Sequence, residues 1–163
     1  MRRISDWVVP AANPSGAIYG VIVIGALLAA ESGRHESYLD TFLSAAIAAA
    51  LYWVAHSYAG VLGRRLSTGE RLTAAALLGA LAHDWALIRG ASIPLLALAV
   101  AALAGAAQET AVTAAVWSSI VSLAAFELIA GLRSGASRGE LALEVAVGVA
   151  MGLAILALKI VLH

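Results

Sequence analysis

The sequence predicts an all-α integral membrane protein with five transmembrane helices, a cytoplasmic N-terminus and an external C-terminus. Of its 163 residues, 62% are apolar and only 12% are charged. A soluble domain usually carries about 25% charged residues, because its surface must be wetted. Several apolar stretches also approach the roughly 20 residues that a helix needs to cross the hydrocarbon layer. Arginine gathers in loops that would share one side of the membrane, and positive charge marks the cytoplasmic side.

The five predicted spans form a single membrane domain over residues 1–163. Their ranges are about 14–30, 41–63, 84–107, 110–132 and 140–161. We expect Asn13 to cap the first span, with Pro14 at its first helical position. We expect Asp40 to cap the second span and Asp84 to cap the third. A short interfacial helix over about 70–82 would precede the third span.

The region 72–107 allows two interpretations. Its apolar runs are interrupted by His83, Asp84 and Arg89, and Pro94 follows. In the first interpretation one span begins near Asp84. In the second, a helical hairpin turns between Arg89 and Pro94, which would give six spans.

The distribution of basic residues favours five spans. With the N-terminus inside, eight arginines fall on the cytoplasmic side: Arg2, Arg3, Arg64, Arg65, Arg71, Arg89, Arg133 and Arg138. Only Arg34 and Lys159 fall outside. The hairpin would move three of the eight outside and weaken the asymmetry on which orientation depends. Trp7 and Trp85 then precede the first and third spans, where interfacial aromatic residues are expected.

Glycines recur at helical spacing in two spans. Gly16 and Gly20 are four residues apart in the first span, as are Gly148 and Gly152 in the last. Such small-xxx-small patterns let helix backbones approach closely. They fit packing within an alanine-rich bundle, and they also fit the interface of a homodimer. A symmetric dimer is attractive because an odd number of short spans encloses a pathway poorly.

Six polar side chains inside the predicted spans form the candidate site. They are Tyr19, Tyr52, His56, Tyr58, Glu127 and Glu144. Tyr52 and His56 are four residues apart and share a helix face. Counted from the cytoplasmic ends, Tyr19, His56 and the two glutamates lie roughly 6–10 Å deep at a rise of about 1.5 Å per residue.

Three interpretations of this polar layer stay open. It can be a structural hydrogen-bond network, in which His56 donates to Glu127 or Glu144. It can be a cation or proton site, because histidine titrates near neutral pH and buried carboxylates can hold protons. Glu144 can also snorkel to the membrane interface.

Other classes of function find little support in the sequence. A net charge of zero argues against a nucleic-acid partner. The lack of cysteine excludes disulfides and thiolate metal sites. The adjacent pair His83-Asp84 could suggest metal binding, but neighbouring residues point apart on a helix and capping explains them better. Hydrolase, zinc-protease and phosphate-loop motifs do not occur, so we expect neither an enzyme nor a cofactor.

The order of features resembles the membrane region of the vacuolar iron transporter family, whose members have five spans and work as dimers. The resemblance rests on Tyr19-Gly20, on Trp85 followed by Pro94-Leu95, on the turn Leu132-Arg133-Ser134, and on the Gly-rich range 147–152. The family's first-span acidic residue and its metal-binding insertion have no counterpart here, so its metal ligands are not carried over. The pattern Tyr-Trp-x-Ala-His-x-Tyr, at residues 52–58, is similar to one in small actinobacterial membrane proteins of no assigned activity.

The leading functional hypothesis is a small transporter or channel for a cation or proton. It would act as a homodimer in the plasma (inner) membrane, with the lipid bilayer as its surroundings and the six polar side chains as its site. The alternative is a non-transporting membrane scaffold or interaction protein whose polar layer is only structural. An intramembrane enzyme comes third.

Overall fold

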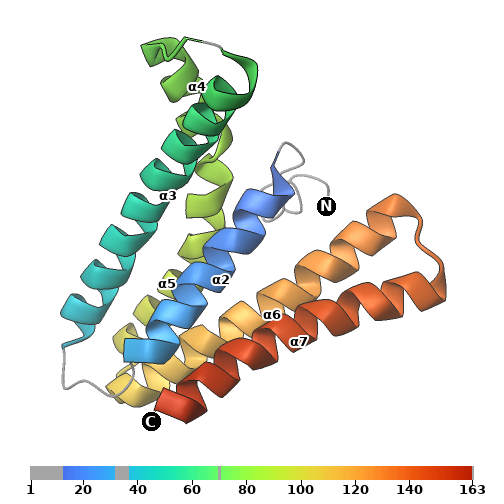
Figure 1. The fold of residues 1–163 in the computed structure, drawn as a ribbon. Coiled ribbons are helices and arrows are strands. Elements are labelled where there is room, and N and C mark those ends of the chain that lie inside the picture. Colours follow the sequence, from blue (N-terminus) through green and yellow to red (C-terminus); the bar gives the residue numbers. More distant parts are fainter. Residues whose placement is uncertain (1–12, 32–36, 70, 163) are drawn as a thin grey trace.

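The structure is a computed structural model that describes residues 13–31, 37–69 and 71–162. These residues form helices joined by short turns, and no strand occurs among them. With the labels of Figure 1, the helices are α2 (Pro14–Glu31), α3 (Tyr38–Thr68), α4 (Ala74–His83), α5 (Trp85–Leu103), α6 (Gln108–Ser134) and α7 (Arg138–Leu162). The predicted all-α class is confirmed. Arg2, Arg3, Trp7 and Arg34 lie outside the described residues.

Successive helices run in alternating directions, except that α5 continues in the direction of α4 (Figure 1). Among the described residues, α3, α6, α7 and the combined stretch 74–103 of α4 and α5 are long and apolar enough to cross a membrane, and α2 is a shorter apolar helix. The described residues therefore make five passes along the bundle, and the start of α2 lies at the opposite end from the end of α7 (Figure 1). The turn between α6 and α7 points away from the other helices.

The helix α2 is the centre of the bundle, since it contacts α3, α5, α6 and α7. Its side chains Val21, Ile24 and Leu28 are fully buried. A helix that meets neighbours on several sides must be apolar all round, and α2 has no charged residue between its first residue and Glu31. The helix α3 is peripheral, and large apolar side chains on its outer face are exposed: Leu39, Leu43, Ile47, Leu51 and Val54.

Two glycines bring α2 and α5 into direct backbone contact. A Cβ atom on Gly20 would overlap the carbonyl oxygen of Leu87 and lie 2.7 Å from the backbone nitrogen of Ala91. A Cβ atom on Gly90 would likewise overlap the carbonyl of Ala17. The two positions require glycine because the backbones cross too closely for any side chain.

The glycines of the last span also pack within the chain. A Cβ atom on Gly148 would lie 3.1 Å from the carbonyl oxygen of Leu123, and one on Gly152 would lie 2.8 Å from Cγ2 of Ile120. Both neighbours belong to α6. Gly20, Gly148 and Gly152 are therefore used for packing between helices of the same chain.

Several helix ends differ from the predicted ones. The helix α3 runs from Tyr38 to Thr68 rather than over 41–63, and its N-cap is Ser37 rather than Asp40. The hydroxyl of Ser37 accepts a hydrogen bond from the backbone N–H of Asp40 at 3.2 Å, so Asp40 lies in the first turn. The helix ends where Gly69 adopts a φ of 72°, a left-handed conformation that glycine adopts without strain.

The stretch long enough to cross a membrane covers α4 and α5 together, from Ala74 to Leu103, rather than beginning near residue 84. Asp84 occupies the predicted N-cap position of α5. Its side chain makes no capping hydrogen bond to α5, because its Oδ1 atom accepts a hydrogen bond from Asn13 instead. The helix α5 is continuous through Arg89 and Pro94, which excludes the hairpin of the six-span interpretation. It ends at Leu103 rather than near residue 107.

The remaining ends shift by only a few residues. The turn after α5 contains Gly105, with a φ of 77°, and α6 and α7 begin at Gln108 and Arg138, two residues before their predicted starts. The short helix predicted over about 70–82 is α4 (Ala74–His83), capped by Thr73.

The predicted cap of the first helix, Asn13, is confirmed, and its side chain also forms hydrogen bonds to residues outside α2. The Oδ1 atom of Asn13 accepts a hydrogen bond from the backbone N–H of Gly16 at 2.9 Å. Its amide nitrogen donates to the carbonyl oxygen of His83 at 3.2 Å and to Oδ1 of Asp84 at 3.1 Å. Asn13 therefore fastens the start of α2 to the junction of α4 and α5, 70 residues further along the chain.

Candidate functional site: a carboxylate pair between α6 and α7

Glu127 and Glu144 lie on the facing sides of α6 and α7, and each lies against a glycine of the other helix. A Cβ atom on Gly148 of α7 would come within 2.7 Å of Cγ of Glu127. A Cβ atom on Gly131 of α6 would overlap Oε2 of Glu144. The missing glycine side chains thus leave the space that the two glutamate side chains occupy between the helices.

The arrangement follows from a pattern that occurs once in each helix. Glu127 precedes Gly131 by four residues, and Glu144 precedes Gly148 by four residues. Residues four apart lie on one helix face. Because α6 and α7 run antiparallel, the glutamate of each helix meets the glycine of the other. Gly148 was predicted only as a packing residue, and Gly131 was not predicted; the repeated Glu-x-x-x-Gly pattern is the signal that could have identified both.

The electrostatics of this pair are unfavourable without a counter-charge. The Oε2 atom of Glu144 is buried and has no hydrogen-bond partner among the described residues. Glu127 is close enough for its charge to interact unfavourably with that of Glu144. Two ionised carboxylates in a partly buried site repel each other and have lost much of their hydration. The pair can therefore share a proton or hold a small cation.

His56 belongs to a separate group on the other side of α2. Its ring lies 6.1 Å from that of Tyr19 on α2 and 6.0 Å from that of Tyr52 on α3, measured between ring centroids. The ring contact with Tyr52 follows from their four-residue spacing. Tyr58 does not join either group through a ring contact or hydrogen bond among the described residues, and 47% of its surface is exposed.

The expected direct link between the histidine and the carboxylates is absent. No hydrogen bond joins His56 to Glu127 or Glu144 in the part of the chain that the structure describes. Figure 1 shows the reason, since α2 lies between α3 and the α6–α7 hairpin. The six predicted residues are therefore divided into a carboxylate pair, a cluster of Tyr19, Tyr52 and His56, and an isolated Tyr58.

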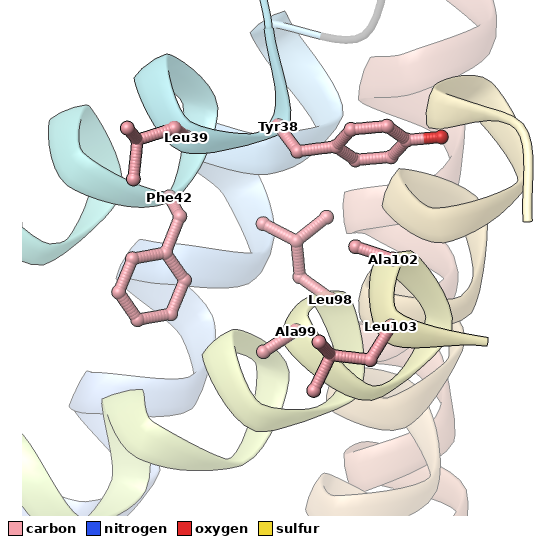
Figure 2. Close-up of a pocket in the computed structure, with 7 residues that line it drawn as sticks. All are labelled: Tyr38, Leu39, Phe42, Leu98, Ala99, Ala102 and Leu103. Atoms are coloured by element: carbon pink, nitrogen blue, oxygen red, sulfur yellow. The ribbon is translucent and has the colours of Figure 1, made fainter. Parts of the chain in front are cut away.

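An apolar pocket of about 320 Å³ lies between the start of α3 and the end of α5, away from the carboxylate pair. Figure 2 shows Phe42 of α3 and Leu98 of α5 on its walls, with the hydroxyl of Tyr38 directed away from it. That hydroxyl donates a hydrogen bond to the carbonyl of Ala106. The pocket offers no polar group for chemistry.

No group of three or more histidine, aspartate or glutamate side chains that could hold a metal ion occurs in the described ranges. Comparison of the chain with protein-family models, with curated proteins and with solved structures finds no match. The resemblance to the vacuolar iron transporter family stays a prediction.

Proposed function

We propose that this chain is a five-span protein of the plasma membrane that binds and conducts protons or small cations through the Glu127–Glu144 pair. The observation that carries the proposal is the buried Oε2 atom of Glu144, which lacks a partner beside a second carboxylate. The negative charge of a carboxylate in that position is removed when a proton binds and is balanced when a cation binds. Reversible loading of such a site is the elementary step of proton or cation transport.

The membrane setting rests on the apolar helices and their outer faces. Large apolar side chains cover the exposed side of α3, including Leu43, Ile47 and Leu51. Hydrocarbon would solvate these side chains, whereas water would not. Five passes put the start of α2 in the cytoplasm and the end of α7 outside, because this orientation keeps eight of the ten basic residues inside.

The cluster of Tyr19, Tyr52 and His56 is a second titratable group in the same proposal. His56 is half-buried beside the rings of Tyr19 and Tyr52. In the proposal it is a polar group on the α3 side of α2, separate from the carboxylate pair.

Homodimer formation remains part of the proposal, but the glycine patterns do not form its interface. Gly20, Gly148 and Gly152 are covered by helices of the same chain.

The alternative function, a scaffold whose polar layer only fixes helix register, requires satisfied hydrogen bonds. Glu144 does not meet that requirement. Transport therefore has the stronger support.

Flux measurements in proteoliposomes test the transport proposal. Vesicles containing the wild-type chain and a pH-sensitive dye should respond to a pH gradient or to a gradient of sodium or potassium. Glu144→Gln and Glu127→Gln keep the size of the side chain but remove its charge, and should lower the flux by about tenfold or more. Glu109→Gln is the matched control, because Glu109 lies exposed in the first turn of α6. Wild-type flux in both pair variants would refute the assignment.

Reporter fusions test the topology separately. Fusions after Arg65 and Arg138 should report a cytoplasmic location, and fusions after Glu36 and His163 an external one. A cytoplasmic C-terminus would contradict five membrane passes in this orientation.

A further inference from the structure

A polar groove lies between α3 and α4, away from the carboxylate pair. Its volume is about 370 Å³. The residues that determine its chemistry are Ser57, Gly60 and Arg64 of α3, with Gly79, His83 and the junction residue Asp84 on the facing side. Since α3 and α4 run antiparallel, Arg64 lies at the end where α4 begins, and Ser57 lies at the end where α4 stops. The groove therefore has an arginine at one end and an aspartate at the other.

Two glycines keep the groove open. A Cβ atom on Gly79 would meet no atom within 4 Å. A Cβ atom on Gly60 would meet only Nη1 of Arg64, at 3.9 Å. The guanidinium group of Arg64 thus extends back along α3 and lies over Gly60.

Ser57 is the unusual residue of this groove. Its side chain is fully buried, with 0% of its surface exposed. Its hydroxyl oxygen has no hydrogen-bond partner among the described residues. Serines within helices usually bond back to a carbonyl of the preceding turn, as Ser119 does to Ala115 at 3.2 Å. A buried hydroxyl without a partner needs an explanation, and a ligand in the groove supplies one.

The two opposite charges do not neutralise each other. No ion pair involves Arg64 or Asp84 within the described ranges, and one oxygen of Asp84 accepts a hydrogen bond from Asn13 at 3.1 Å. Nη1 of Arg64 lies over Gly60, and Arg64 and Asp84 both line the groove. A small molecule in the groove can therefore contact both charges at once.

We propose that the α3–α4 groove binds a small amino-acid-like zwitterion. Its ammonium group lies against Asp84 and the Ser57 hydroxyl, and its carboxylate lies against Arg64. A simple anion would meet the charge of Asp84, and a simple cation would meet that of Arg64, whereas a molecule with both charges complements the two ends. This binding site is independent of the proposed carboxylate pair.

Titration calorimetry on the full chain in detergent micelles tests the proposal with defined probes. The zwitterions β-alanine and γ-aminobutyrate should bind. Butyrate, which lacks the ammonium group, and butylamine, which lacks the carboxylate, should bind about tenfold more weakly or not at all. Binding of either single-charge probe as tight as that of γ-aminobutyrate, or a failure of both zwitterions to bind, would overturn the proposal.

Substitutions locate the site. Arg64→Gln should weaken γ-aminobutyrate binding by about tenfold, and Arg65→Gln should leave it unchanged, because Arg65 does not line the groove. Equal losses in both variants would mean that only the general positive charge matters, which contradicts the assigned site.

Ser57→Ala separates ligand binding from a structural role. The Ser57 hydroxyl bonds to nothing in the described chain, so its removal should leave the melting temperature unchanged or raise it, while the affinity for γ-aminobutyrate falls. A lower melting temperature with unchanged affinity would show that the hydroxyl serves folding and would refute the proposal. If Arg64→Gln fails to fold, the affinity and melting temperature of Ser57→Ala still test the proposed binding site.

Discussion

Gly20→Ala should destabilise the bundle more than its single added methyl group suggests. The new Cβ atom would overlap the carbonyl oxygen of Leu87 and lie 2.7 Å from the backbone nitrogen of Ala91. Extra methyl groups in a packed interior cost about 1–3 kcal/mol, because neighbouring side chains must leave their preferred rotamers. Here the obstructing atoms are backbone, so α2 and α5 must separate. We therefore expect a loss near the upper end, about 3 kcal/mol.

Gly63→Ala is the matched control for this prediction. Gly63 lies within α3, and a Cβ atom there would meet nothing within 4 Å. The substitution should raise stability by up to about 1 kcal/mol through higher helix propensity. The free energy of unfolding can be measured by denaturant titration of the full chain in detergent micelles, followed by tryptophan fluorescence.

The partner position offers a further check on the same contact. Gly90→Ala should be about as harmful as Gly20→Ala, and the double variant should cost less than the sum, because one separation of the helices relieves both overlaps. Equal stabilities of Gly20→Ala and Gly63→Ala would refute the close helix crossing.

Two more predictions concern single polar side chains. Asn13→Ala removes the α2 cap and the link to the α4–α5 junction, and should lower the free energy of unfolding by about 1–3 kcal/mol. Asn13→Ser, which keeps a capping oxygen but loses the amide donor, should recover part of the loss. Full stability of Asn13→Ala in the same denaturant titration would show that the link is unimportant. Glu144→Gln should raise stability by about 1 kcal/mol in alkaline, salt-poor buffer, because it removes a charge beside Glu127 and breaks no hydrogen bond of Oε2. A clear loss of stability in that variant would mean that the Glu144 carboxylate has a partner within the fold.

Local features of the sequence were sufficient to predict the helices. Asn13 and Pro14 mark the start of α2 through the chemistry of a helix cap, which depends only on neighbouring residues. The second cap was assigned to Asp40, although Ser37 lies three residues earlier and accepts a hydrogen bond from the backbone N–H of Asp40. Both residues suit the cap position, so propensity alone did not separate them.

The candidate site was only partly predictable. Helical periodicity indicates that Tyr52 shares a face with His56, and that Glu144 shares one with Gly148, because both statements concern a single helix. Depth along the helix axis suggested one polar layer. It carries no information on direction around the axis, so it could not reveal that α2 separates His56 from the two glutamates.

Apolar helices of membrane-spanning length can be predicted from the sequence, because that property depends on composition summed along each segment. Which helix faces meet depends on the packed bundle. Packing places Gly20 against the backbone of α5, Glu127 and Glu144 against opposing glycines, and the Ser57 hydroxyl in a groove beside α4. These pairings depend on the choice of neighbouring helix and the distance of closest approach, and both are set by the packing of all the helices together rather than by any one of them.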